Sequence, residues 1–300
     1  MKSGKFFYIL VILAIVVIVY LGWYLYSNTG MMRCGPCGCL NDQCGGGISW
    51  KLLYSSSNLQ GHSIAAECNP GNGTNCSCLD EDASLVSNSN YGEVIANPFH
   101  KNTWVNAIGY KKFIESFPDG SKIKLDVYKY TALTRMPTLP SPNDNQQQNP
   151  QAVHLMMQLY DGRNEFGRGS KNSLEATVFW ELNPWTEAGR SGKISLYTPD
   201  PNNPKVPILS DTGFQIKDTN WHNITLEADF SAEKYISITV DGNKKYINVP
   251  LLKLNKPDWN SSISFSITTE SEPSWPRQNC EKIFYWNQYF KDIKFYKRVV

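Results

Sequence analysis

The sequence lacks an excess of charge of either sign. Its 300 residues include 29 Lys and Arg against 27 Asp and Glu, which gives a formal net charge of +2 at pH 7. Basic and acidic residues are interspersed along the chain rather than gathered into runs. A nucleic-acid-binding protein usually presents a basic patch to the phosphate backbone. The sequence therefore predicts no nucleic-acid partner.

The common short catalytic motifs are also missing. The chain contains no His-Glu-x-x-His, no phosphate-binding glycine loop and no Gly-x-Ser-x-Gly. These motifs mark zinc proteases, P-loop nucleotide hydrolases and serine hydrolases of the α/β type. No motif for an organic cofactor is present either, so no such cofactor is predicted. Of the four His, only His154 lies in a pattern that suggests a site.

One long uncharged run stands near the N-terminus, at residues 6–26 (FFYILVILAIVVIVYLGWYLY). At about 1.5 Å per helical residue it reaches about 30 Å, the thickness of a bilayer's hydrocarbon core. Lys2 and Lys5 precede it, and the next charge is Arg33. The positive-inside rule then predicts a cytoplasmic tail at 1–5, a single transmembrane anchor at 6–26 and an extracellular remainder at the cell membrane. A cleaved signal peptide is the alternative, but its apolar core usually spans only about 7–15 residues.

All eight cysteines follow this anchor: Cys34, Cys37, Cys39, Cys44, Cys68, Cys76, Cys78 and Cys280. An even number in an oxidising compartment predicts disulfides, whose connectivity the sequence leaves open. Cys280 stands alone in the second half, and we expect it to pair with a cysteine between 68 and 78. A redox Cys-Gly-Pro-Cys at 34–37 and a zinc site in the first four cysteines are alternatives. Residues 27–88, rich in Gly and Cys, are predicted to form a disulfide-stapled juxtamembrane segment.

Beyond residue 88 the pattern changes to short runs in which apolar and polar residues alternate. In the run 153–160, Val153 and the apolar residues at every second position share one face; the same pattern recurs in 175–182 and 263–267. In the run 122–130 the alternation places Ile123, Leu125 and Val127 on one face. A period of two with one apolar face is typical of antiparallel β-sheet. No comparable stretch keeps a helical period.

The most specific stretch is 221–246 (WHNITLEADFSAEKYISITVDGNKKY). Strand patterns flank a turn near Ser231 and a second turn at Asp241-Gly242-Asn243, and Asp-Gly between alternating strands favours a tight hairpin. The run 289–296 (YFKDIKFY) has the pattern of a closing strand. Together these features resemble the concanavalin A-like lectin and glucanase superfamily, as in laminin G-like and pentraxin-like domains. The resemblance implies an all-β, two-sheet antiparallel jelly-roll sandwich over residues 89–300, and does not by itself imply an activity.

The enzymes of this superfamily have motifs that the chain does not match. The hydrolases usually carry a Glu-x-Asp-x-x-Glu cluster on one strand, which is missing. Glu175 and Glu181 share a strand face, but at about 3.3 Å per residue they lie about 20 Å apart, whereas hydrolytic pairs need about 5–10 Å. The alginate lyases use Gln-x-His, and here His154 and Gln158 occur in the opposite order. A lyase site built from His154, Tyr160 and Arg163 remains an alternative.

Aromatic residues make up 13% of the chain, and flat rings can stack on the apolar face of a sugar or fill a β-sandwich core. The sequence favours a non-catalytic, membrane-anchored extracellular protein that recognises a carbohydrate or a cell surface. The alternatives are a polysaccharide hydrolase or lyase and a structural envelope or adhesion protein. A weaker candidate is a Ca²⁺ site at Asp161 and Glu165. The candidate ligand-binding residues share one predicted polar face, with a Trp near its rim: His154, Gln158, Tyr160, Glu175, Glu181 and Trp185.

Overall fold

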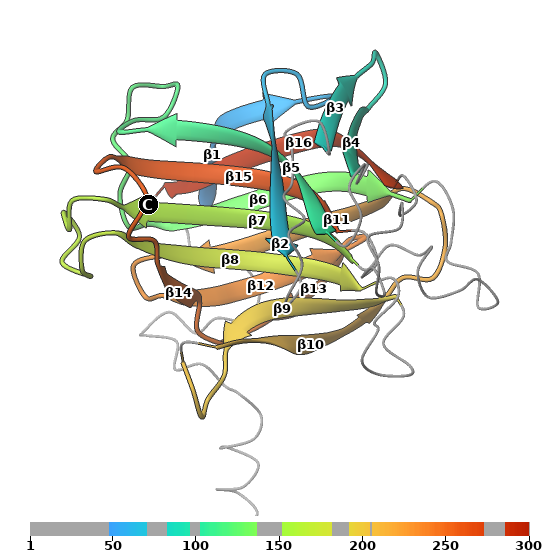
Figure 1. Cartoon of the computed structure of the whole chain (residues 1–300). Coiled ribbons are helices and arrows are strands. Elements are labelled where there is room, and N and C mark those ends of the chain that lie inside the picture. Colours follow the sequence, from blue (N-terminus) through green and yellow to red (C-terminus); the bar gives the residue numbers. More distant parts are fainter. Residues whose placement is uncertain are drawn as a thin grey trace, which may run out of the picture. The chain divides into compact units, whose positions relative to one another are not determined.

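The computed structural model describes residues 48–70, 83–96, 103–136, 152–181, 192–204, 206–272 and 286–299. The described residues belong almost entirely to one compact unit, Ser49–Val299 (Figure 1). Among these described residues, no helix is long and apolar enough to cross a membrane. The predicted anchor at 6–26 lies outside them. Seven of the cysteines lie outside them as well, and only Cys68 falls within a described strand.

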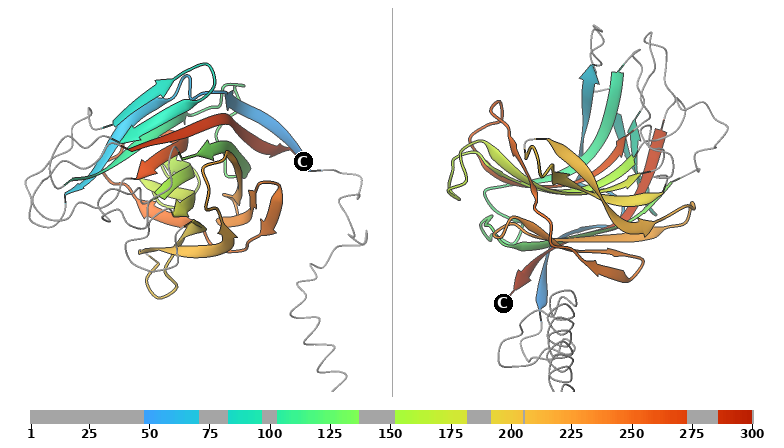
Figure 2. Two further views of the ribbon diagram at one scale, coloured as in Figure 1. Left: turned by 90° about the vertical axis from the view of Figure 1, so that its right-hand side faces the viewer. Right: turned by 90° about the horizontal axis from the view of Figure 1, so that it is seen from below.

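Two eight-stranded antiparallel sheets form the unit, packed as two curved layers (Figure 2). Sheet 1 has the order β13-β12-β11-β6-β16-β4-β3, with β1 also paired to β16. Its strands are β1 (Ser49–Ser56), β3 (Ala83–Ser87), β4 (Gly92–Ala96), β6 (Val127–Arg135), β11 (His222–Asp229), β12 (Lys234–Val240), β13 (Asn243–Tyr246) and β16 (Trp286–Val299).

Sheet 2 has the order β10-β9-β8-β7-β15-β5-β2, with β14 also paired to β8. Its strands are β2 (Ser63–Pro70), β5 (Thr103–Ile114), β7 (Ala152–Asp161), β8 (Asn172–Glu181), β9 (Lys193–Pro199), β10 (Pro207–Gln215), β14 (Leu252–Asn255) and β15 (Ile263–Glu272). The described part contains strands and no helix, so the predicted all-β antiparallel sandwich is confirmed.

The core lies between the sheets, where the predicted alternation places its apolar residues. Sheet 2 supplies Val153, Leu155, Met157 and Leu159 from β7, Ala176, Val178 and Trp180 from β8, and Ile263, Phe265 and Ile267 from β15. Each of these side chains exposes 3% of its surface or less, which is the burial that makes apolar contact stabilising. The period-two pattern therefore identified the core face of these three strands correctly.

The run 122–130 is only partly a strand: the predicted apolar residues Ile123 and Leu125 do pack in or against the core, but they precede the strand. Strand β6 begins only at Val127, and the core residues on it are Tyr128, Tyr130 and Ala132. The two Tyr rings are fully buried, and Tyr128 lies 4.7 Å from Phe265 between ring centroids. The contact between the two sheets therefore buries the large aromatic side chains Tyr128 and Tyr130. Their hydroxyls remain bonded to backbone carbonyls, at Lys124 for Tyr128 and at Thr268 for Tyr130.

The sandwich also begins earlier than the predicted boundary at residue 89. Strands β1, β2 and β3 come from the segment that we expected to be a juxtamembrane connector, and they pair with β16, β5 and β4 respectively. Leu53, Leu59 and Ala83 from this region are buried in the core. Polar, Gly-rich composition concealed these strands, because edge strands need fewer apolar residues than central ones.

The meander in 221–246 follows the prediction closely. Strands β11 and β12 pair along their length, and β13 pairs with β12 through the turn at Asp241 and Gly242. Both turn residues have positive φ, 49° and 82°, as a type I′ hairpin requires. This local chemistry is independent of the rest of the fold, which is why the sequence was sufficient to predict it.

Candidate functional site

One face of sheet 2 is directed away from the core and carries polar side chains in its centre. We call this surface the polar face. On β7, β8 and β15 it consists of the residues that alternate with the core residues: His154, Met156, Gln158, Tyr160, Ser173, Glu175, Thr177, Phe179, Glu181, Ser264, Ser266, Thr268 and Glu270. The strand register sets them in rows across the sheet.

The five predicted site residues that the structure describes all lie on this face: His154, Gln158, Tyr160, Glu175 and Glu181. Each exposes 7% of its surface or less. A buried polar group must find a hydrogen-bond partner or carry a desolvation penalty, so their partners determine what the face can bind. Trp185, the predicted rim residue, lies outside the described residues.

Glu175 is held as a fixed hydrogen-bond acceptor. Gln158 stands opposite it on β7, and its Nε2 donates to Glu175 Oε1 over 2.6 Å. Ser173 Oγ donates to the same oxygen over 3.0 Å, and Lys256 Nζ lies 3.9 Å from it. These bonds orient both the carboxylate and the Gln158 amide before any ligand arrives.

A second group forms around His154. Its Nδ1 lies 3.3 Å from Glu270 Oε2 on the neighbouring strand β15, and its ring centroid is 3.7 Å from that of Phe179 on β8. Glu181, near the end of β8, accepts a hydrogen bond from Ser195 Oγ over 2.9 Å. Sequence reasoning missed Glu270, because no local pattern shows that β15 pairs with β7.

Between these two groups lie two buried hydroxyls without a partner. Thr177 on β8 and Thr268 on β15 both flank Met156 in the strand register. Thr177 Oγ1 and Thr268 Oγ1 are buried, and neither has a hydrogen-bond partner among the residues that the structure describes. The centre of the polar face therefore has unused hydrogen-bonding capacity.

Trp259 marks one end of the polar face and was also missed from the sequence. It lies in the loop between β14 and β15 and exposes 37% of its surface. Its ring centroid is 5.1 Å from that of Tyr160, and Lys112 and Lys256 place their Nζ atoms 5.8 and 5.4 Å from it. Trp259 thus provides an accessible aromatic surface where the buried part of the face ends.

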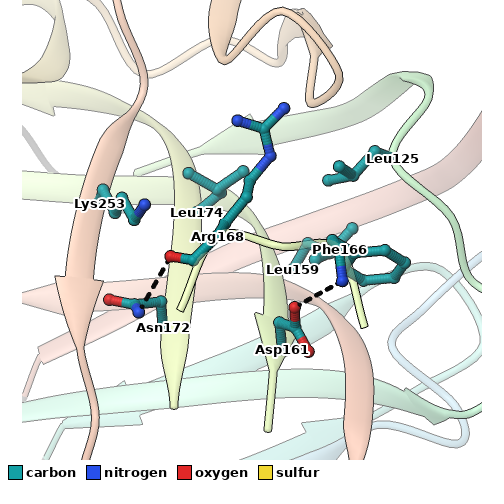
Figure 3. Close-up of a pocket in the computed structure, with 8 residues that line it drawn as sticks. All are labelled: Leu125, Leu159, Asp161, Phe166, Arg168, Asn172, Leu174 and Lys253. Atoms are coloured by element: carbon teal, nitrogen blue, oxygen red, sulfur yellow. Dashed lines mark hydrogen bonds between the residues drawn. The ribbon is translucent and has the colours of Figure 1, made fainter. Parts of the chain in front are cut away.

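The predicted Ca²⁺ residues do not form an oxygen cluster in the described structure. Asp161 Oδ2 accepts a hydrogen bond from the Phe166 amide over 2.9 Å, beside a small pocket that Leu159 and Leu174 help to line (Figure 3). Its Oδ1 accepts from the Glu165 amide over 3.0 Å, so Asp161 stabilises the loop that follows β7. No group of three His, Cys, Asp or Glu side chains in the described ranges is arranged to hold a metal ion.

Comparisons by sequence found no relatives, since no protein-family model and no curated protein matches the chain. By structure, the chain is similar to an endo-1,3-beta-glucanase (laminarinase) from Thermotoga petrophila, at 12% identity and TM-score 0.40, covering 84% of this chain and 100% of that one. It is also similar to an alginate lyase from a Chlorella virus, at 10% identity and TM-score 0.38, covering 82% and 100%.

A third match is lectin I-B4 from Griffonia simplicifolia, at 10% identity and TM-score 0.36, covering 77% of this chain and 98% of that one. At these identities and TM-scores, evidence for the function of this chain comes from its own residues.

Proposed function

We propose that this protein binds a carbohydrate chain at the polar face of sheet 2, without catalysis, and that binding begins at Trp259. The observation that supports this most strongly is the pair of buried hydroxyls of Thr177 and Thr268, which have no hydrogen-bond partner in the described part of the chain. Sugar hydroxyls donate and accept hydrogen bonds, and each must exchange water for a protein partner on binding. The exposed ring of Trp259 offers the flat apolar surface on which a pyranose stacks.

The carboxylates of the polar face favour recognition over hydrolysis. Glu175 and Glu181 are separated along one strand by about 20 Å at about 3.3 Å per residue, too far for a hydrolytic pair. Each accepts a hydrogen bond from a neutral side chain, Gln158 for Glu175 and Ser195 for Glu181. Carboxylates held in this way serve as acceptors for ligand hydroxyls.

A second candidate function is supported by the contact of His154 with Glu270. A carboxylate 3.3 Å from His154 Nδ1 orients the imidazole, an arrangement that suits a general base or acid. On a uronate-containing polymer such a pair would abstract a proton and cleave the chain by elimination. Falling polymer viscosity together with new unsaturated, ultraviolet-absorbing ends would favour this lyase over a binding protein.

The location of this function is part of the proposal. The uncharged run 6–26 with Lys2 and Lys5 before it supports a single-pass anchor, a cytoplasmic N-terminus and an extracellular sandwich. The ligand would then be a glycan outside the cell.

A glycan array probed with the detergent-solubilised full chain tests the binding function. For a glycan that binds, replacing Trp259 by Ala should weaken affinity by about 1–3 kcal/mol, the scale of losing one aromatic anchor. Thr177→Val should weaken it while keeping side-chain volume. The matched control is Tyr246→Ala, since Tyr246 is 66% exposed on the β13 edge of the other sheet. Equal effects at Trp259 and Tyr246 would contradict the proposed site.

A further inference from the structure

A cluster of aromatic and basic side chains lies on sheet 1, on the face directed away from the core. It comprises Tyr91, Arg135, Trp221, Tyr289 and Lys291, which we call the outer patch. Arg135 and Tyr289 are register partners on β6 and β16, and Lys291 follows on the same face of β16, opposite Leu133. Tyr91 immediately precedes β4, and Trp221 immediately precedes β11. The patch therefore gathers residues from four separate parts of the chain.

The rings of the patch hold its two cations in place. The guanidinium carbon of Arg135 lies 5.4 Å from the Trp221 ring centroid and 5.2 Å from that of Tyr289. Lys291 Nζ lies 4.3 Å from the Trp221 ring, and Tyr91 packs 4.8 Å from Tyr289 between centroids. Cation–π contacts of this kind restrict long side chains that otherwise lose considerable rotamer entropy on binding.

Neither cation is neutralised by an acid within the described part of the chain. No carboxylate there lies within ion-pair distance of Arg135 or Lys291, and the buried Nε of Arg135 has no hydrogen-bond partner. Glu93, the register partner of Tyr289 on β4, is the carboxylate closest in the strand pairing. Two ordered positive charges thus share a small area, and within the described ranges Arg135 Nε remains without an acceptor.

A second aromatic and basic group on this face, around Lys129, shows a contrast. Lys129 Nζ lies 4.2 Å from the Trp50 ring and 4.5 Å from the Tyr296 ring. Glu227 stands beside Lys129 in the strand register and is bonded to Lys244 Nζ over 3.0 Å. Glu227 therefore stands directly opposite Lys129 and favours its charge, whereas no carboxylate of the described residues stands opposite Arg135 or Lys291 in the register.

We propose that the outer patch is a second ligand site, which binds the carboxylate or sulfate groups of an acidic polysaccharide. The planar guanidinium of Arg135 suits a bidentate oxyanion, and Lys291 adds a second charge beside it. The neighbouring Tyr and Trp rings suit the apolar face of the sugar that carries the acid. A net charge of only +2 and interspersed acids argue against a nucleic acid, which needs a continuous basic field.

Binding of polygalacturonate to the detergent-solubilised full chain, compared with its fully methyl-esterified form, tests the charge requirement. The acidic polymer should bind and the ester should not, and added salt should weaken the interaction. Arg135→Gln and Lys291→Gln should each weaken binding about tenfold, the effect of losing one charge-assisted contact. The matched control is Lys294→Gln, which removes an exposed Lys from the same strand and face, with no ring contact in the described structure.

Trp221→Leu gives a second measurement, because it keeps both charges and removes the ring that orders them; weaker binding is again expected. Thermal melts of all variants should stay close to that of the parent protein. Trp259→Ala, measured in parallel, separates the two sites: binding that is lost in Trp259→Ala but kept in the Arg135 and Lys291 variants would place the polymer at the polar face and overturn the proposal. The proposal is overturned if Lys294→Gln weakens binding as much as Arg135→Gln and Lys291→Gln do. It is equally overturned if the methyl-esterified polymer binds as tightly as polygalacturonate, or if polygalacturonate does not bind. It is also overturned if duplex DNA binds equally well through Arg135 and Lys291.

Discussion

Tyr160 illustrates at the scale of a single residue how a side chain with site-like chemistry can be part of the packing. Its hydroxyl donates to the Asn260 carbonyl over 2.7 Å, its ring contacts Trp259, and only 1% of its surface is exposed. It connects the loop before β15 to the end of β7. Tyr160 therefore positions Trp259, and under the proposed function the ligand would contact Trp259 rather than Tyr160.

Tyr160→Ala should accordingly lower the free energy of unfolding by about 3 kcal/mol, the usual cost of deleting a buried aromatic ring. Tyr160→Phe keeps the ring and loses one hydrogen bond, so about 1 kcal/mol is expected. Chemical denaturation of both variants measures the difference. An unchanged unfolding midpoint for the Ala variant would show that the ring contributes no packing.

His222 holds two loops together at the start of β11. Its Nδ1 lies 2.7 Å from Asp241 Oδ2, in the hairpin turn, and its Nε2 lies 2.8 Å from Asp218 Oδ1. Burial by itself would lower the pKa of His222, but the hydrogen bonds and charges of the two carboxylates raise it above its ordinary value. The protonated form is thus favoured in the folded state.

Because the pKa of His222 is higher in the folded than in the unfolded state, protonation of His222 stabilises the fold. This stabilisation is complete below the unfolded-state pKa of about 6.5 and is lost as pH rises through the folded-state pKa. His222→Gln should therefore cost more stability at mildly acidic than at mildly alkaline pH. Melting temperatures measured across that range provide the test. Asp241→Asn, which keeps an acceptor for the Asn223 amide, should reduce the pH dependence; a pH-independent loss in His222→Gln would contradict the assignment.

At the scale of elements, the described strands before residue 89 are integral to both sheets. Strand β1 pairs with β16, β2 with β5 and β3 with β4, and Leu53, Leu59 and Ala83 complete the core. A chain beginning at residue 89 would leave β5 and β4 each without a partner on one side, and β16 without one from Ile293 to Val299. It would also expose the core beneath them, which favours aggregation.

We expect a chain beginning at residue 48 to melt cooperatively and a chain beginning at residue 89 to be insoluble or to melt at a much lower temperature. Circular dichroism melts of the two purified chains give the comparison. If both melt at the same temperature, the first three strands are dispensable and the sandwich is complete without them.

At the scale of the whole molecule, the cysteines and the N-terminal run remain predictions. Cys280 is expected to pair with a cysteine between 68 and 78, because an unpaired extracellular thiol would be reactive. A bridge of that kind closes a loop of about 200 residues and would add a few kcal/mol of stability on a chain-entropy estimate. Peptide mapping without reduction should find the bridged pair, and a Cys280 that alkylates freely would refute it.

The predicted orientation in the membrane has its own test. Protease added to intact cells should remove the sandwich and leave a short membrane-bound fragment that contains residues 6–26. Reduced and non-reduced samples should be compared, since disulfides can hold cleaved fragments together. A protected sandwich, or a mature N-terminus near residue 30, would contradict the anchor.

The sequence by itself determined the features that depend on local chemistry. Alternation set the core faces of β7, β8 and β15, and the Asp241-Gly242 turn set the β12–β13 hairpin, because strand pleat and turn dihedrals act over a few residues. The sequence also predicted that His154, Gln158 and Glu175 lie on one face of the sheet. The reason is that alternate residues along a strand point to the same side of the sheet.

Only the tertiary structure decided which strands became neighbours. Pairing of β7 with β15 brought Glu270 to His154, and the loop before β15 brought Trp259 to Tyr160. It also turned Tyr128 into the core and gathered the outer patch from four distant segments. These contacts join residues about 70 or more positions apart, and their energies depend on packing that no short sequence pattern records.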